Sequence, residues 1–225
     1  MIAVLGLIWI YFHWATNSIF LTPRNLSNLT TQMSVTGILA VGMLMVIVSA
    51  NIDLAVGSVL GFAGGVAAYL LTTQELGLLP AITLAIAVGL VIGALHGFLT
   101  AYLRIPAFIV TLGGLLAWRG GVKWLLGGNT VPVSDPVFKG IGQGNLPATA
   151  GWAIAAAAIG ITFFLAYRRA AAIREYGLGE AHYGRAMAAA FIPVAAIAGF
   201  IWVMNSYQGV PIPVLIFVSV AVIGV

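Results

Sequence analysis

Cysteine is absent from the 225-residue sequence, and charged residues make up only 6% of it. An average soluble domain carries about 25% charged residues, so this composition argues against a water-soluble fold of this size. The lack of cysteine also excludes disulfide frameworks, thiolate nucleophiles and cysteine metal sites.

Catalytic and nucleotide-binding motifs are missing as well. The sequence has no G-x-x-x-x-G-K-[ST], H-E-x-x-H or G-x-S-x-G motif, and the glycine-rich stretch 140–144 lacks the spacing of a dinucleotide fingerprint. The three histidines fall in different segments, which predicts no metal site. We therefore expect no cofactor and no enzymatic activity, and any step that needs ATP would use a separate chain.

What the sequence does have is long apolar stretches. Hydrophobic residues make up 62% of the chain and the mean hydropathy is +1.12. At about 20 apolar residues per membrane span, roughly 140 such residues would supply about seven spans. The runs are continuous and do not alternate, which favours helices over a β-barrel. The sequence predicts an all-α polytopic membrane bundle in one domain, 1–225, with eight candidate spans at 2–16, 33–48, 54–72, 80–102, 106–126, 151–167, 188–205 and 211–225.

Three of the segments between these runs are long and polar. Residues 20–32 are interrupted by Pro23, asparagines and threonines and are expected to form a loop that leads into the next helix. Residues 127–150 are rich in glycine and proline, and residues 168–187 are rich in charge. Cytoplasmic loops carry an excess of Lys and Arg, so 168–187 is predicted to lie inside and 127–150 outside, with the charges of the inner loop contributed by Arg168, Arg169, Arg174, Glu175, Glu180 and Arg185.

Glycines spaced by four occur in the third and fourth candidate spans. This spacing places each set on one helical face, where two backbones can approach closely. Helix packing is the interpretation that we adopt for Gly57, Gly61, Gly65, Gly89, Gly93 and Gly97. His96 lies beside the second set, and an interhelical hydrogen bond is favoured there over a proton relay.

The stretch 49–58 places Asn51 and Asp53 between two apolar runs. Asp53 could cap the helix expected from Leu54, where its charge would meet unpaired N–H groups and the positive end of the dipole. Interrupted helices also line polar pathways, because unpaired backbone at membrane depth is tolerated only against protein or water. The two interpretations are compatible.

The stretch 105–114 opens the fifth span with Pro106 near its first turn, where a missing N–H does no damage. Thr111 follows inside the span. Arg119 comes later, and a guanidinium in lipid must snorkel, pair or face water. Snorkelling beside Trp118 and a role in the pathway are equally favoured by the sequence.

Three segments in this order resemble the permease subunit of bacterial monosaccharide ABC importers. They are FLTPRNLSNL, GILAVGMLMVIVSANIDLAVGSVLGFAGG and IPAFIVTLGGLLAWRG, and the resemblance runs through most of residues 20–130. The IDL-[SA]-VGS and AFIVTLG elements are specific when found together. Ala55 stands where the family often has serine, which removes one hydroxyl from the expected pathway.

The resemblance implies a substrate. The long charged connection at 168–187 resembles the xylose branch of the family, so D-xylose is the expected sugar, with ribose or a related sugar as the alternative. The family's ATPase-contacting element resembles nothing in 1–225 and would follow the eighth span. The chain is therefore expected to be a fragment, shortened at its C-terminus and, from its brief first run, at its N-terminus.

The resemblance also implies partners and site residues. A second permease subunit, in a homodimer, two cytoplasmic ATP-binding subunits and an external sugar-binding protein would assemble with this chain in the bacterial cell membrane. Because the sugar is neutral, polar and aromatic groups would suffice to line the pathway. The expected pathway residues are Asn51, Ser58, Phe108 and Thr111, with Asp53 and Arg119 supporting helix ends or the pathway.

A rival hypothesis is an ion-coupled secondary transporter in which Asp53 binds a proton or cation at a broken helix. A non-transporting membrane scaffold is a further alternative. Transport that needs an ATPase would separate the importer from both.

Overall fold

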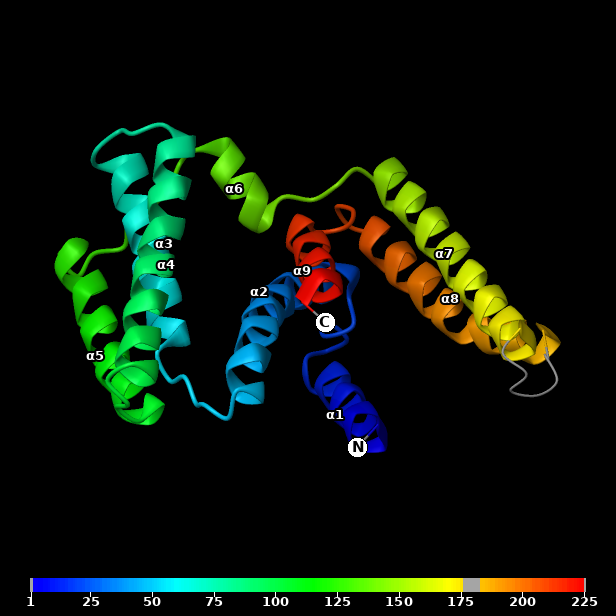
Figure 1. Ribbon diagram of the computed structural model, residues 1–225. Coiled ribbons are helices and arrows are strands. Elements are labelled where there is room, and N and C mark those ends of the chain that lie inside the picture. Colours follow the sequence, from blue (N-terminus) through cyan, green and yellow to red (C-terminus); the bar gives the residue numbers. More distant parts are fainter. Residues whose placement is uncertain (1, 176–182, 225) are drawn as a thin grey trace. The chain divides into compact units, whose positions relative to one another are not determined.

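The computed structural model describes residues 2–175 and 183–224. Within these ranges, the regular structure is helical apart from an isolated bridge between Asn145 and Pro211, so the all-α prediction is confirmed (Figure 1). The helices are α1 Ile2–Ala15, α2 Pro23–Val48, α3 Val56–Thr72, α4 Leu78–Ala101, α5 Ala107–Leu125, α6 Pro136–Gln143, α7 Ala148–Glu175, α8 Tyr183–Asn205 and α9 Ile212–Gly224.

Each of the eight predicted apolar runs coincides with one of these helices. Four helical stretches are long and apolar enough to cross a membrane: α2, α4, α8 and residues 148–173 of α7. Shorter apolar helices occur at Ala3–Ala15, Val56–Thr72 and Ile212–Gly224. Helix α5 is 19 residues long and carries Arg119 and Lys123 within it. The fold is that of a polytopic membrane helix bundle, and the number of spans stays a prediction.

Helix α2 begins ten residues before the apolar run that marks it, so the prediction of a loop over 20–32 was wrong for most of that segment. Pro23 occupies the first helical position, where its missing N–H breaks no hydrogen bond. The Thr22 hydroxyl accepts a hydrogen bond from the Asn25 N–H at 3.4 Å. The Thr30 and Thr31 hydroxyls donate to carbonyls of their own helix, which satisfies them inside it.

Short helical additions also appear in the two long connections. Within 127–150, α6 begins at Pro136, and the Asp135 carboxylate accepts the Phe138 N–H at 2.8 Å as a cap. Within 168–187, α7 continues to Glu175, because the alanines after Arg169 are strong helix formers, and α8 begins at Tyr183. Residues 176–182, which include Glu180, lie outside the described residues. The sidedness of both segments stays a prediction.

The chain divides into two compact units, and each is described by itself. The first consists of Gly144–Leu215 with the residues up to Met33. Here α7 packs against α8, and the buried core is formed by Ala155, Ile201, Met204 and Val210. Backbone hydrogen bonds from Leu146 N to Val210 O and from Ile212 N to Gly144 O hold together the segments before α7 and after α8.

The second unit consists of Ser34–Gln143 with the residues from Ile216 onward. Helix α3 packs against both α4 and α5. Glycines permit the approach of α3 to α5 at two points: a Cβ at Gly65 would lie 2.6 Å from Val122, and one at Gly121 would lie 3.1 Å from Phe62. The Phe62 and Trp118 rings lie 5.4 Å apart between α3 and α5. This three-helix group positions the site described below.

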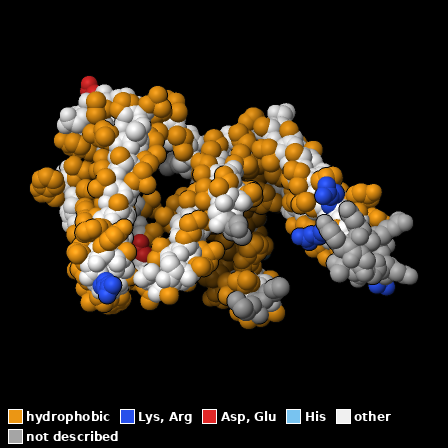
Figure 2. All heavy atoms as spheres, in the orientation of Figure 1, with side chains coloured by type: hydrophobic (Ala, Val, Ile, Leu, Met, Phe, Trp, Pro, Cys, Tyr) orange, Lys and Arg blue, Asp and Glu red, His pale blue; other side chains and the backbone are white. Residues whose placement is uncertain are grey.

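Hydrophobic side chains cover most of the visible surface of both units. The charged groups are few, and several of the Lys and Arg groups lie near one another toward one end of α7 and α8 (Figure 2). Large apolar side chains such as Leu79, Ile192 and Trp202 are more than half exposed. A surface of this kind is stable in hydrocarbon and unfavourable in water. The chain is accordingly a multi-pass membrane protein.

Candidate functional site

The break between α2 and α3 is a fixed turn held by its own polar groups. Ala50 adopts φ +58°, in the left-handed region. The Asn51 side chain donates to the Ser49 carbonyl at 2.9 Å, and the Asp53 carboxylate accepts the Ala55 N–H at 2.7 Å. Helix α3 starts at Val56, not Leu54, so Asp53 bonds to the N–H just ahead of the helix. The segment therefore contains hydrogen bonds of its own, besides those to other helices.

Thr111 ties this segment to α5. Its hydroxyl is buried and lies 3.2 Å from the Ile52 carbonyl and 2.8 Å from the Ala107 carbonyl of its own helix. The Ile52 carbonyl lies outside any helix, so this contact supplies a partner that the backbone lacks there. Two of the predicted site residues, Asp53 and Thr111, therefore act on the same turn.

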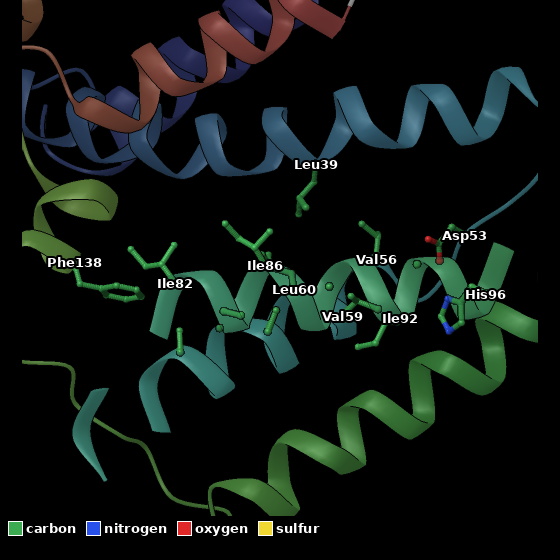
Figure 3. A pocket seen from close by; sticks show the side chains of 16 residues that line it. Leu39, Asp53, Val56, Val59, Leu60, Ile82, Ile86, Ile92, His96 and Phe138 are labelled. Carbon is green, nitrogen blue, oxygen red and sulfur yellow. The ribbon is translucent and has the colours of Figure 1, made fainter. Parts of the chain in front are cut away.

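A cavity of about 450 Å³ runs along α3 and α4 in this unit (Figure 3). Ile82 and the α6 side chain Phe138 line one end, and Asp53 and His96 line the other. The 14 residues from Ile82 to His96 correspond to about 21 Å along a helix at 1.5 Å per residue. The wall between the ends is apolar, formed by Leu39, Val56, Val59, Leu60, Ala63, Gly64, Ala67, Ala85, Ile86, Gly89, Ile92 and Gly93.

His96 joins α4 to α5. Its Nε2 atom accepts a hydrogen bond from Trp118 Nε1 at 3.2 Å, which confirms the predicted interhelical hydrogen bond. The ring lies against Gly114, where a Cβ would be 2.6 Å from both Cε1 and Nε2 of the imidazole. The same Cβ would lie 3.4 Å from the Ala55 Cβ, so the ring and the start of α3 are close neighbours. Gly114 thus brings three helices together around His96.

A second cavity of about 290 Å³ lies between α3 and α5. Ser58 and Arg119 line it, and they are the polar side chains in its wall. The Ser58 hydroxyl donates at 2.8 Å to the carbonyl of Ala55, the residue just before α3. Arg119 is exposed, so the structure places its guanidinium at the cavity edge and at the surface together. Snorkelling and a role in a pathway both remain predictions.

The four predicted pathway residues do not converge on one cavity. Ser58 lines the smaller cavity, while Thr111 is buried and Asn51 bonds within its own turn. Phe108 is 52% exposed on the first turn of α5. Their direct contact with a substrate stays a prediction.

The six glycines spaced by four also have different surroundings. A Cβ added at Gly65 would contact α5. A Cβ added at any of the other five glycines would have no described heavy atom within 4 Å, apart from its chain neighbours and the backbone of its own helix. Gly89 and Gly93 line the larger cavity, and Gly57 and Gly61 line the smaller one. Helix packing through these five glycines stays a prediction.

Three residues of the site, His96, Trp118 and Phe138, are not among the site residues predicted from the sequence. For His96 the sequence predicts an interhelical hydrogen bond but no place in the pathway, and Trp118 is predicted only as an interfacial neighbour of Arg119. Phe138 gave a local signal, since Asp135 and Pro136 begin a helix. Nothing in the sequence indicated that this helix would reach a cavity lined by α3 and α4.

A family model described as "Branched-chain amino acid transport system / permease component" matches residues 25–223. The chain is 41% identical over 222 residues to the xylose transport system permease protein XylH of Escherichia coli (strain K12), a match covering 96% of this chain and 55% of that protein. It is 37% identical over 225 residues to XylH of Haemophilus influenzae, covering 100% and 60%.

The ribose import permease protein RbsC of Escherichia coli (strain K12) is 44% identical over 120 residues, which cover 53% of this chain and 36% of that protein. The chain therefore spans little more than half the length of the xylose permeases that it matches. No solved structure matches it.

Proposed function

Since the chain belongs to the family described as "Branched-chain amino acid transport system / permease component", we propose that it forms the membrane pathway of an ATP-driven monosaccharide importer. The observation that carries this proposal is near-complete coverage by proteins named as xylose permeases. The apolar helices and the cavity along α3 and α4 support it. ATP hydrolysis belongs to a separate subunit.

D-xylose is the proposed substrate. The family description names branched-chain amino acids, but the xylose permeases of Escherichia coli and Haemophilus influenzae match 96% and 100% of the chain. The ribose permease matches 53% of it, so ribose is the second candidate. Neither sugar carries a charge, which agrees with a cavity wall that is apolar along most of its length.

The proposed assembly contains two copies of the permease, two cytoplasmic ATP-binding subunits and an external sugar-binding protein. The permease would alternate between outward-facing and inward-facing states as the ATPases close and open, a rigid-body exchange of access. Asn51, Ser58, Phe108 and Thr111 are the proposed pathway residues. Asp53 and Arg119 are proposed to support the helix ends or the pathway itself.

Reconstitution of the full-length permease with its ATP-binding subunits and sugar-binding protein in proteoliposomes tests this function. We expect D-xylose uptake that requires ATP on the cytoplasmic side and loaded binding protein on the other. Uptake driven by an ion gradient with no ATPase present would instead support the secondary transporter that uses Asp53. ATP-dependent uptake of ribose in preference to xylose would retain the importer and change its substrate.

A further inference from the structure

Two polar atoms at the Asp53 end of the larger cavity, one on Asp53 and one on His96, are held in place but have no hydrogen-bond partner among the described residues. One carboxylate oxygen of Asp53 accepts the Ala55 N–H at 2.7 Å. Among the described residues, the other oxygen has no hydrogen-bond donor. Asp53 lines the cavity wall, and its carboxylate lies at the same end as the His96 ring in Figure 3. This end therefore offers one acceptor that carries negative charge.

His96 supplies the complementary donor. A nitrogen that accepts a hydrogen bond carries no proton, so the bond from Trp118 to Nε2 requires a neutral ring protonated at Nδ1. No described residue accepts a hydrogen bond from that Nδ1–H, and the ring lines the cavity. One donor and one acceptor therefore lie at the same end of an otherwise apolar wall.

Both groups are fixed before any ligand arrives. Gly114 and Trp118 hold the imidazole between α4 and α5. The segment that carries Asp53 is bonded to α5 through the Thr111 hydroxyl and the Ile52 carbonyl. Polar groups already held in their binding geometry lose little conformational entropy on binding, so they contribute more of their hydrogen-bond energy to affinity.

We propose that Asp53 and His96 form a hydroxyl-binding subsite for the transported monosaccharide, an inference that rests on the proposed function. Sugar hydroxyls both donate and accept hydrogen bonds, so the hydroxyls of one sugar can donate to Asp53 and accept from His96. The apolar side chains of Val56 and Ile92 beside them suit the C–H surface of the ring.

The composition of the wall selects against charged substrates. The cavity lining contains one carboxylate and one imidazole, and it contains no lysine or arginine. A substrate carboxylate would meet the Asp53 charge with no cation to balance it, which is costly at membrane depth. A neutral polyol meets neither penalty. The subsite therefore fits a sugar better than a free amino acid.

The absence of cysteine from this chain allows a direct test by cysteine protection. Gly93 lines the cavity one turn before His96, and no described neighbour would contact a side chain there. Gly97 lies on the same helix, has the same freedom and is not in the cavity lining. Gly93→Cys and Gly97→Cys, each in an otherwise cysteine-free full-length permease within the assembled transporter, would be labelled with a small maleimide in the presence of D-xylose.

We expect D-xylose to slow labelling of Gly93→Cys and to leave labelling of Gly97→Cys unchanged, with sucrose as the osmotic control. Adding Asp53→Asn keeps an oxygen for the Ala55 N–H and replaces the acceptor that faces the sugar with a donor. This change should raise the half-protecting xylose concentration about tenfold, the value of one hydrogen bond to a charged group. The labelling rate without sugar should stay the same, which excludes unfolding as the cause.

Asp135→Asn is the matched control, because the Asp135 carboxylate also accepts a nearby backbone N–H, that of Phe138, but lies outside the cavity lining. Equal protection by xylose in the Asp53→Asn and Asp53 backgrounds would overturn the subsite, as would the absence of protection at Gly93→Cys. ATP-driven xylose uptake, measured on the same preparations, distinguishes failure of the subsite from failure of the proposed function. Uptake without Asp53-dependent protection refutes the subsite alone, whereas absence of uptake by the unsubstituted transporter refutes the proposed function.

Discussion

The Thr111 hydroxyl lies 3.2 Å from the carbonyl oxygen of Ile52, a residue 59 positions earlier in the chain. The contact joins α5 to the non-helical turn between α2 and α3. The Ile52 carbonyl lies outside any helix, so a helical ladder gives it no partner. Helix α5 therefore holds a turn that the proposed sugar subsite depends on.

Thr111→Val should release this turn. The substitution preserves the shape of the side chain but removes the donor, and a hydrogen bond of this kind contributes about 1 kcal/mol. The Ala55 N–H donates a hydrogen bond to the Asp53 carboxylate. Its hydrogen exchange should become about fivefold faster, since 1 kcal/mol corresponds to roughly that factor.

Thr83→Val is the control for this experiment. The Thr83 hydroxyl donates only to the Leu79 carbonyl of its own helix, at 2.8 Å. Its loss should leave exchange at Ala55 unaltered. If the two variants exchange equally at that amide, Thr111 does not hold the turn.

The helices could be predicted from the sequence because an apolar run long enough to cross a bilayer has few structural options. The helix ends could not be predicted in the same way. Helix α2 begins among polar residues at Pro23, and α7 continues past Arg169, since capping and alanine propensity act independently of hydropathy. Hydropathy alone therefore locates the apolar helices and misses the helical turns beyond them.

The residues of the site, too, could be predicted only in part from the sequence. Asp53 stood out because a carboxylate between two apolar runs is unusual, and His96 because it is a polar group within a long span. Phe138 is brought to the cavity from a separate helix, and that juxtaposition depends on tertiary packing. The glycines that packing requires at Gly114 and Gly121 also lie outside the spaced sets of α3 and α4, because the partner side chain decides where a glycine is needed.

Gly114→Ala should destabilise the α3, α4 and α5 group. A methyl group there would lie 2.6 Å from the His96 ring, which is pinned by Trp118 and cannot move away without losing that hydrogen bond. Overpacking of this kind costs about 1–3 kcal/mol. The midpoint of thermal unfolding of the detergent-solubilised permease, followed by loss of the monodisperse chromatographic peak, should fall.

Gly113→Ala provides the adjacent control, since no described atom outside its immediate surroundings lies within 4 Å of the new methyl group. Alanine is the better helix former by about 0.5–1 kcal/mol, so this variant should be as stable as the parent or slightly more so. Equal destabilisation by the two substitutions would show that the close approach at Gly114 is not responsible.

Trp118→Phe should weaken the packing of α4 on α5. It retains an aromatic ring beside Phe62 but removes the donor to His96 Nε2. Hydrogen bonds between membrane helices average about 0.6 kcal/mol, so a small loss of stability is expected. Loss of the bond also frees the imidazole to change tautomer, so xylose protection at Gly93→Cys should weaken.

The same substitution at Trp124 tests whether the effect is local. Trp124 lies on the same helix but is 85% exposed, so Trp124→Phe should leave both stability and xylose protection unchanged. A comparable loss of protection from Trp124→Phe would contradict the assignment of Trp118 as the residue that positions His96.

In the other unit, Gly151→Ala should weaken the contact between α7 and α8. A Cβ at this position would lie 2.8 Å from Asn205 Oδ1, and the Asn205 amide donates to the Ala148 carbonyl at 3.3 Å. Displacement of the amide would leave that carbonyl, in the first turn of α7, without this donor. The cost combines overpacking with a lost hydrogen bond, about 1–3 kcal/mol. Resistance of the purified permease to unfolding by SDS should fall, whereas Gly160→Ala on the same helix, where the new methyl group meets no described neighbour within 4 Å, should leave it unchanged or raise it.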